Sequence, residues 1–387
     1  MRSARRLSST PPYVFATLDG KIARLREQGV DIIRLDIGSP DGPPPEAVVR
    51  ALARSASDPG KHGYAGYAGT PALRAAMVHY YRQRFGVVLD TASQVLPLIG
   101  SKEGIAHLAM AWLDPGDVAL VPDPGYPTYA ASVALAGGQA YTMPLRADRQ
   151  WLPDLAAIPE AIAQRARLMW LNYPNNPTGA TAPLSYFEEA VAFCRRHDIL
   201  LCHDAPYADV GYDGYRAPSV LQVAGADDVA VEFNSLSKSH NMAGWRVGMA
   251  AGNAIAIGAL AQLKTNIDSG HFLAIQDASV AAFQTPASWI DQRNAVYQAR
   301  RDALLPVLVD DLGLETATPS AGLYLWPRVP RGTTSAEFAD RILAETGVSL
   351  TPGSAFGACG EGYLRISLGQ TTERFMMAVE RLRGMRL

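Results

Sequence analysis

Cysteine is scarce in this sequence, and the few cysteines present form no recognisable framework. The chain of 387 residues contains three of them, Cys194, Cys202 and Cys359. An odd number without metal-ligand spacing argues against a disulfide scaffold and against a zinc site. The usage fits a reducing compartment instead, and we therefore expect a cytoplasmic protein.

Long apolar runs and an excess of charge of one sign are also missing. No hydrophobic stretch of the sequence approaches the length needed to cross a bilayer. The 35 basic and 37 acidic side chains nearly cancel and leave a formal net charge of −2. Such a balance offers no field to attract nucleic acid or an anionic membrane surface. The sequence therefore predicts neither a nucleic-acid partner nor a membrane partner.

The amino terminus carries positive charge without the features of a secretion signal. Its start, MRSARRLSST, contains three arginines, but no apolar stretch follows them. The Arg and Ser content resembles a transit peptide only faintly, and we expect a disordered tail. The remaining chain, with 48% hydrophobic and 19% charged residues overall, is typical of a soluble globular protein. Its length allows one large domain and a smaller one.

Short apolar strands alternate with helices through most of the chain, and each strand ends at a polar residue or a turn. This alternation indicates an α/β fold with a mostly parallel sheet between helices. Ligands of such sheets bind in the crevice at the carboxyl ends of the strands. Although each residue at these ends could be an ordinary turn or packing residue, their common placement predicts one crevice formed by Gly38, Ser101, Tyr126, Asn176, Asp204 and Lys238.

Lys238 is the residue around which this crevice is expected to be organised. It follows an apolar run, residues 229–233, within DVAVEFNSLSKSHNMAGWRVG. The hydroxyls of Ser235 and Ser237, with Arg246 eight residues on, can gather anionic groups beside it. A lysine in this position could form a Schiff base with a carbonyl cofactor if burial or positive charge keeps its amine neutral. The competing interpretation is a surface lysine in a polar turn.

Two further stretches contain groups that could hold a planar, phosphorylated ligand. GSKEG, residues 100–104, lies where a strand gives way to a helix, and free amides at a helix amino terminus attract phosphate. Tyr126, in DPGYPTY, could stack on a planar ring or pack as an ordinary tyrosine of a turn. Neither stretch matches a nucleotide-binding fingerprint.

Charged side chains in two other strands require partners. Asp204 ends the strand of DILLCHD, where a carboxylate is costly unless a donor such as a protonated ring nitrogen faces it. His203 beside it lacks further ligands at metal spacing, so no metal site is predicted. Arg365 lies within the apolar strand YLRISL, where either a substrate carboxylate or an internal salt bridge would satisfy it.

The chain changes character towards its carboxyl end. Residues 255–286 are expected to be helical, with KTNIDSGHF as an interruption, and a long helix follows that ends near Asp311. GLYLWPRV, SLTPGSAF and YLRISL then read as strands of a smaller α+β domain. We expect an amino-terminal arm with part of the small domain in residues 1–45, a large cofactor-binding domain in residues 46–285 and the small carboxyl-terminal domain in residues 286–387.

Taken together, these motifs resemble those of the class I/II aminotransferases, pyridoxal-phosphate enzymes of fold type I. The strongest pieces are NNPTG, the pair Asp204-x-x-Tyr207 and SLSKSHNMAGWRVG, and the resemblance covers nearly the whole chain. GVDIIRLDIGSPD, GSKEG and KTNIDSGHF look closest to the branch with LL-diaminopimelate, alanine and glutamate aminotransferases. Two departures leave the substrate open: GPPPEAV stands where a Thr-Pro is expected, and His240 where an aromatic residue is frequent.

The resemblance implies roles for the residues of the crevice. Lys238 looks like the lysine that binds the cofactor covalently and carries the proton of the substrate α-carbon. Asp204 would keep the ring nitrogen protonated. Asn176 and Tyr207 would contact the phenolic oxygen of the ring, and Tyr126 would stack on its face. The phosphate cup would consist of Ser101, Lys102, Ser235 and Arg246.

The resemblance also implies how substrates and a second subunit take part. Arg365 would clamp the α-carboxylate of the amino acid, helped by the Gly38 backbone and by Asn176. Tyr64 lies five residues before Gly69, as in the family loop that reaches the phosphate of the neighbouring subunit. The implied protein is a homodimer with composite active sites, whose substrates are amino acids and 2-oxo acids.

Two other functions compete with transamination. A lyase, for example one that eliminates a sulfur group from the β-carbon, would use the same cofactor residues, because fold and cofactor do not dictate the reaction. An effector-sensing module of a transcription regulator would need a DNA-binding domain, for which the residues before the first family strand leave little room. The combination of Lys238, Asp204 and Arg365 favours catalysis.

Overall fold

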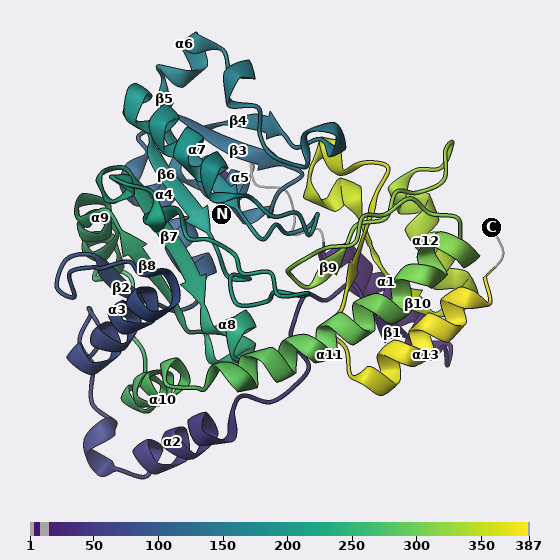
Figure 1. The fold of residues 1–387 in the computed structure, drawn as a ribbon, viewed down its shortest axis with the longest axis horizontal. Coiled ribbons are helices and arrows are strands. Elements are labelled where there is room, and N and C mark those ends of the chain that lie inside the picture. Colours follow the sequence, from purple (N-terminus) through teal and green to yellow (C-terminus); the bar gives the residue numbers. More distant parts are fainter. Residues whose placement is uncertain (1–3, 8–14, 386–387) are drawn as a thin grey trace.

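The computed structural model describes residues 4–7 and 15–385 (Figure 1). The predicted amino-terminal tail therefore lies mostly outside the described residues, as does the beginning of PPYVFATLDG. Of the tail, Arg5–Leu7 forms one 3-10 turn. The first helix, α1, spans Phe15–Glu27.

A seven-stranded sheet forms the centre of the larger part of the molecule (Figure 1). The strand order is β2-β8-β7-β6-β5-β3-β4, and only β8 runs antiparallel to its neighbours. Most of its strands are buried throughout, as a sheet covered on both faces requires. The predicted α/β fold with a mostly parallel sheet is thus confirmed. The strands are β2 (Val95–Leu98), β3 (Val118–Asp123), β4 (Gln139–Pro144), β5 (Ala166–Asn172), β6 (Leu200–Asp204), β7 (Ala230–Ser235) and β8 (Gly248–Gly252).

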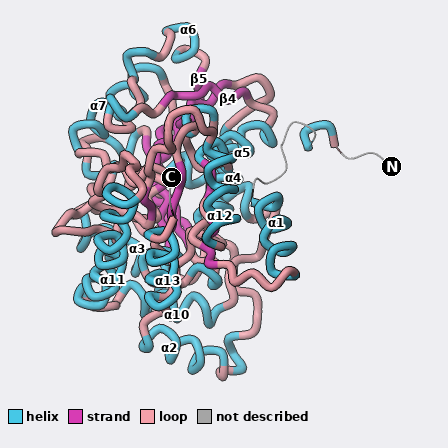
Figure 2. The backbone as a smooth tube through the Cα atoms, turned by 90° about the vertical axis from the view of Figure 1, so that its right-hand side faces the viewer, coloured by secondary structure: helices cyan, strands magenta, loops and turns pink. Residues whose placement is uncertain are grey.

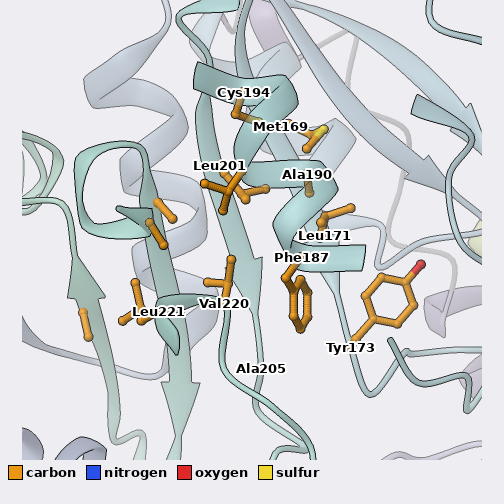
Figure 3. Packing of buried hydrophobic residues seen from close by; sticks show 14 of the residues in the cluster. Met169, Leu171, Tyr173, Phe187, Ala190, Cys194, Leu201, Ala205, Val220 and Leu221 are labelled. Atoms are coloured by element: carbon orange, nitrogen blue, oxygen red, sulfur yellow. The ribbon is translucent and has the colours of Figure 1, made fainter. Parts of the chain in front are cut away.

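Helices lie on both sides of this sheet (Figure 2). On one face, α4 (Ser101–Trp112), α5 (Thr128–Ala136) and α9 (Ala254–Lys264) bury apolar side chains against the strands in a single cluster. On the other face lie α3 (Pro71–Phe85) and α7 (Leu184–His197). Figure 3 shows α7 from close by, with Phe187, Ala190 and Cys194 near Met169, Leu171 and Leu201 of the strands.

The smaller part of the molecule contains a three-stranded antiparallel sheet in the order β11-β12-β9 and a separate parallel pair, β1-β10. The pair joins the two ends of the chain, because β1 lies near the amino terminus and β10 near the carboxyl terminus. The predicted boundaries at residues 45 and 285 remain predictions. The elements of this part are β1 (Ile33–Arg34), β9 (Tyr324–Leu325), β10 (Val348–Ser349), β11 (Thr351–Pro352), β12 (Leu364–Ser367), α12 (Ser335–Thr346) and α13 (Thr372–Arg383).

The remaining helices connect the two parts or lie beside the large sheet. α11 (Ala287–Pro306) runs from one part to the other (Figure 1). α2 (Glu46–Ala56) packs on α10 (Leu273–Phe283), and KTNIDSGHF separates α9 from α10 as predicted. Two short helices are α6 (Glu160–Ala163) and α8 (Leu236–Ser239). In the described part of the chain, no helix is long and apolar enough to cross a membrane.

Three elements differ from the predicted ones. The sequence DIIRLDIG predicts one strand, but only β1 forms, because beyond it the carbonyl oxygens of Asp36 and Gly38 accept hydrogen bonds from Arg365 and Lys238 instead of continuing a ladder. The run of residues 246–251 predicts a strand that starts at Arg246, but β8 begins two residues later, because Arg246 has a φ of 59°. The helix expected to end near Asp311 is α-helical only to Pro306, and a π-helical turn, Val307–Asp311, follows it.

Candidate active site

A cavity of about 420 Å³ opens at the carboxyl ends of the central strands, where the small part of the molecule meets the large one. β5, β6 and β7 end at its wall, and residues of β9 and β12 lie opposite them. All predicted site residues except Tyr64 line it: Gly38, Ser101, Lys102, Tyr126, Asn176, Asp204, Tyr207, Ser235, Lys238, Arg246 and Arg365.

Lys238 lies on α8, directly after β7, and Ser235 caps this short helix. Its Nζ donates a hydrogen bond of 2.5 Å to the carbonyl oxygen of Gly38. Burial, together with the positive charges of Arg365 and Arg246, lowers the pKa of Lys238 to about 8. The amine is therefore neutral in a substantial fraction of molecules just above neutral pH, which allows it to act as a nucleophile and as a base.

Arg293 of α11 holds the backbone that carries this lysine. Its Nη1 donates to the carbonyl oxygens of Lys238 and, at 2.7 Å, of Ser239, and its Nη2 donates to that of Asp209 at 2.7 Å. The guanidinium is buried, and burial lowers the pKa of Arg293. Sequence reasoning missed this residue, since Arg300 and Arg301 on the same helix are equally conspicuous.

Asp204 ends β6 and faces the cavity with an incompletely bonded carboxylate. Oδ2 accepts a hydrogen bond of 2.6 Å from the hydroxyl of Tyr129, whereas Oδ1 is buried with no hydrogen-bond partner in the described residues. Burial raises the pKa of Asp204 to about 6, against the opposing effects of the Tyr129 bond and of His203. Asn172 donates to the Asp204 carbonyl oxygen at 2.7 Å and fixes the end of the strand. Oδ1 is thus available to accept from a protonated ring nitrogen.

Backbone amides and cations converge at the other end of the cavity. Ser101 begins α4, so its amide lies at the positive end of the helix dipole. Lys102, Ser235 and Arg246 line the same end. Gly100 has a φ of 78°, and a Cβ there would lie 2.2 Å from Nη2 of Arg246. This arrangement can bind a phosphate dianion through fixed amides and charge.

The KTNIDSGHF motif supports this end of the cavity from behind. The ammonium of Lys264 is buried and lies 2.6 Å from Asp268 and 3.3 Å from Glu103 of α4. His271 donates through Nε2 to the carbonyl oxygen of Arg246 at 2.9 Å. These contacts hold α4 and the Arg246 backbone in place.

Arg365 lies at the boundary between the two parts, stacked between aromatic rings. Its guanidinium carbon is 4.5 Å from the ring centroid of Tyr324 and 4.7 Å from that of Phe356. Nη1 donates to Oδ1 of Asn176 at 3.0 Å, and Nη2 donates to the carbonyl oxygen of Asp36 at 2.6 Å. The rings hold the guanidinium plane in one orientation, which suits recognition of a carboxylate.

Two tyrosines and a glycine complete the wall beside Arg365. The hydroxyls of Tyr207 and Tyr324 are 2.8 Å apart, and burial raises the pKa of Tyr207. A Cβ at Gly38 would lie only 2.0 Å from the Tyr324 hydroxyl, so the close approach requires glycine. Sequence reasoning did not select Tyr324, whose signal was merely an aromatic residue in an apolar strand. It also did not predict the hydrogen bond from Tyr129 to Asp204.

Two of the tyrosines predicted to bind the cofactor, Tyr126 and Tyr64, differ in their exposure. Tyr126 lines the cavity, with Nζ of Lys102 5.9 Å from its ring centroid. Tyr64 lies outside the cavity and is 93% exposed. The structure therefore does not bring Tyr64 together with the other predicted residues of the same chain.

His240, the departure noted in the sequence, takes the place of an aromatic residue in packing. It is buried, and its ring stacks on Trp289 with 6.1 Å between centroids. Burial lowers the pKa of His240 to about 4, so the ring is neutral at physiological pH. The departure preserves the neutral, planar character of the position.

The cavity fits pyridoxal phosphate on the chemistry of its own residues. One end presents a buried carboxylate oxygen in need of a donor, and the other presents amides, hydroxyls and two cations suited to a phosphate. Between them stands an amine whose pKa is lowered to about 8. These are the groups that a phosphorylated pyridine aldehyde requires.

Comparisons with known proteins agree with this fit. A family model described as aminotransferase class I and II matches residues 30–382. The LL-diaminopimelate aminotransferase of Moorella thermoacetica is 51% identical over 383 residues, which are 99% of this chain and 98% of its own length. The match thus extends over nearly the whole length of both proteins.

Solved structures give the same result. The structure of a probable N-succinyldiaminopimelate aminotransferase from Thermus thermophilus matches with a TM-score of 0.90 and 40% identity, covering 96% of this chain and 99% of that one. A mutant aspartate aminotransferase of the same organism matches with a TM-score of 0.92 and 30% identity, covering 99% of each chain. All of these relatives are aminotransferases, so the lyase alternative has no support. The chain belongs to the class I and II aminotransferases and is an aminotransferase that depends on pyridoxal phosphate.

Proposed function

We propose that the residues lining the cavity hold pyridoxal phosphate in one orientation. Ser101, Lys102, Ser235 and Arg246 bind the phosphate, and Tyr126 stacks on the ring. Asp204 accepts from the ring nitrogen and keeps it protonated, with Tyr129 orienting its carboxylate and Asn172 fixing its backbone. Bound in this way, pyridoxal phosphate supplies an aldehyde that condenses with amines and a cationic ring that stabilises negative charge on the substrate α-carbon.

Asn176 and Tyr207 tune the opposite edge of the ring. The Asn176 amide gives its oxygen to Arg365, which leaves its NH₂ group to donate to the phenolic oxygen. Tyr207 reaches the same oxygen from the hydroxyl pair with Tyr324. Both donors favour the ionised phenolic oxygen.

Lys238 is the catalytic base and acid. In the absence of a covalent bond its amine is neutral above pH about 8, so it can take a proton from the substrate α-carbon and return it. Arg293 keeps the backbone of Lys238 fixed, so that the side chain always extends to the substrate from the same position. Arg365 binds the α-carboxylate of the substrate, with the Gly38 backbone and Asn176 beside it, and thereby places the α-hydrogen near the amine.

The proposed amino donor is LL-diaminopimelate, and the acceptor is a 2-oxo acid. The observation that carries this choice is the 46–51% identity to proteins named LL-diaminopimelate aminotransferase over at least 97% of their length. Glutamate, alanine and aspartate are the other donors that the family resemblance suggested. The reaction runs as two half-reactions: the donor gives up its amino group and leaves as a 2-oxo acid before the acceptor binds and receives that group.

The proposed assembly is a homodimer with composite active sites, working in the cytoplasm. Tyr64 and Tyr67 are exposed on a Gly/Tyr-rich loop whose Gly66 lies against Gly270. A tyrosine that is 93% exposed in one subunit is free to reach the phosphate in the other. The absence of a cysteine framework supports a reducing compartment.

An absorption spectrum of the purified protein, titrated with single amino acids, tests the proposal. With LL-diaminopimelate the yellow band of the bound aldehyde should give way to the band of the amine form, and a 2-oxo acid should restore it. Conversion by glutamate or aspartate alone would move the assignment to another donor. Lys238→Ala should abolish turnover while the protein stays folded, and full activity of that variant would overturn the assignment of the lysine.

A further inference from the structure

One charged pair lines the cavity outside the residues assigned to the cofactor and to the α-carboxylate. Asp19 of α1 and Arg34 of β1 both belong to the cavity wall. Oδ1 of Asp19 lies 2.8 Å from Nη2 of Arg34. The Asp19 side chain is 58% exposed and that of Arg34 is 17% exposed, so the carboxylate is open to solvent while the guanidinium is largely sheltered.

Arg34 is held from behind by a second, fully buried carboxylate. Nε and Nη2 of Arg34 donate to the two oxygens of Asp36 at 2.8 and 2.6 Å. The bidentate geometry fixes the guanidinium plane, and it leaves Nη1 without a hydrogen bond to any residue that the structure describes. One edge of Arg34 is therefore locked and the other is open to a ligand.

A single residue links this pair to the proposed α-carboxylate site. The backbone carbonyl of Asp36 accepts from Nη2 of Arg365, whereas its side chain binds Arg34. The two guanidinium groups thus lie at opposite ends of Asp36. A carboxylate on Arg365 and a second carboxylate on Arg34 would belong to the two ends of one extended molecule.

We propose that Arg34 and Asp19 recognise the distal amino-acid end of the substrate, Arg34 its carboxylate and Asp19 its ammonium group. The inference rests on the proposed donor, LL-diaminopimelate, which carries an amino and a carboxylate group at each end of its carbon chain. An ion pair is complementary to such a zwitterionic end, because the ligand replaces one salt bridge by two. A donor with an uncharged side chain would displace water from the Asp19 carboxylate without offering it a new hydrogen bond or charge.

Asp19→Asn is the first test, because the side chain is exposed and its loss leaves the Arg34–Asp36 pair intact. The assay compares kcat/KM for LL-diaminopimelate with that for L-2-aminopimelate, which has both carboxylates but lacks the distal amino group. We expect the ratio of the two values to fall about tenfold or more in the variant, since a charge-assisted hydrogen bond is lost with only one of the substrates. Arg34→Lys, which keeps the charge over Asp36 but loses the planar fork, should lower kcat/KM for both dicarboxylic donors.

Asp340→Asn is the matched control. Asp340 is similarly exposed, at 52%, and it also binds α1, through a 2.8 Å salt bridge with Lys21, but it does not line the cavity. The ratio should keep its wild-type value in this variant. An unchanged ratio in Asp19→Asn, with the wild type active on LL-diaminopimelate, would overturn the distal site while leaving the proposed donor intact. A wild type that does not convert LL-diaminopimelate would overturn both.

Discussion

The hydroxyl of Tyr129 donates a 2.6 Å hydrogen bond to Oδ2 of Asp204, while Oδ1 of the same carboxylate is buried without a hydrogen-bond partner in the described residues. Without cofactor, the site holds an acid that has lost its hydration and gained one hydrogen bond in return, and burial raises its pKa to about 6. The arrangement costs stability in the free protein. It also increases the free energy gained when a cationic ring nitrogen arrives.

In the cofactor-free protein, we expect Asp204→Asn to raise the free energy of unfolding near pH 7.5. The folded-state pKa of about 6 lies above the ordinary value of 3.8, so protonation of Asp204 stabilises the fold fully below pH 3.8, and this contribution is lost as the pH rises through about 6. The difference between the two values corresponds to about 3 kcal/mol. Urea unfolding measures it: the variant should be the more stable protein near pH 7.5, and the gap should close near pH 4.

With pyridoxal phosphate bound, the wild type should instead be more stable than Asp204→Asn. The carboxylate attracts the protonated ring nitrogen, and the amide does not. Asp123→Asn is the control. Burial also raises the pKa of Asp123, which accepts from the Cys359 amide at 3.0 Å, but Asp123 does not line the cavity. An Asp204→Asn protein that gains as much stability from the cofactor as the wild type does would contradict the role of Asp204.

Cofactor attachment should follow the titration of Lys238. Because the neutral amine is the reactive form and the pKa is about 8, the rate of reconstitution should rise with pH up to about 8 and then level off. Stopped-flow absorbance of the cofactor-free protein mixed with pyridoxal phosphate gives the profile. N-acetyl-lysine amide in the same buffers is the reference amine, whose rate should keep rising beyond pH 10. A protein profile that follows the reference would mean that burial and the two arginines do not depress this pKa.

The residues at the strand ends could be predicted from the sequence because topology alone brings them together. Parallel strands end at the same edge of a sheet, so residues as distant as Ser101 and Lys238 had to share a crevice once the alternation of strands and helices was recognised. Arg365 was predicted for a different reason, since a guanidinium in an apolar strand requires a partner.

Contacts that depend on the packing of one particular side chain could not be predicted. Tyr126 and Tyr129 stand in the same DPGYPTY turn, and only the start of α5 decides that Tyr129 faces Asp204. Arg293 reaches the Lys238 backbone across an interval of 55 residues. The contact between Asp19 and Arg34 depends on how α1 packs against β1, and no short stretch of the sequence predicts that packing.

Gly100→Ala should weaken the binding of pyridoxal phosphate about tenfold or more, because phosphate contacts of fixed geometry are lost when the cup is displaced. The new Cβ would lie 2.2 Å from Nη2 of Arg246 and would push the guanidinium out of the cup. Equilibrium dialysis or fluorescence titration measures the affinity. Pyridoxal, which lacks the phosphate, should bind the variant and the wild type alike.

Gly86→Ala controls for placing a Cβ at a positive φ away from the phosphate cup. Gly86 follows the last residue of α3 with a φ of 71° and a ψ of 10°, whereas Gly100 has a ψ of 152°, and a Cβ at Gly86 would meet nothing within 4 Å. Its substitution should cost about 1 kcal/mol of stability and leave the affinity unchanged. Equal losses of affinity in both variants would show that displacement of Arg246 is not responsible.

Arg293→Lys should lower kcat about tenfold, because Lys238 would lose the fixed backbone from which its amine reaches the substrate. A lysine cannot satisfy the carbonyl oxygens of Lys238, Ser239 and Asp209 together, so we also expect a loss of about 1–3 kcal/mol in the free energy of unfolding. The stability loss alone would not identify a positioning role. The decisive quantity is therefore kcat, measured with saturating substrate and cofactor at a temperature where the variant is fully folded.

Arg301→Lys makes the comparison on the same helix. Arg301 is equally buried and binds Asp213 at 2.7 Å and the carbonyl oxygen of Pro319 at 2.9 Å, but it makes no hydrogen bond to the α8 backbone among the described residues. Its substitution should cost similar stability without lowering kcat. Equal kcat values in the two variants would reduce Arg293 to a purely structural residue. A lower kcat in Arg293→Lys alone, with KM little changed, would show that the backbone of Lys238 has to be held for the proton to move.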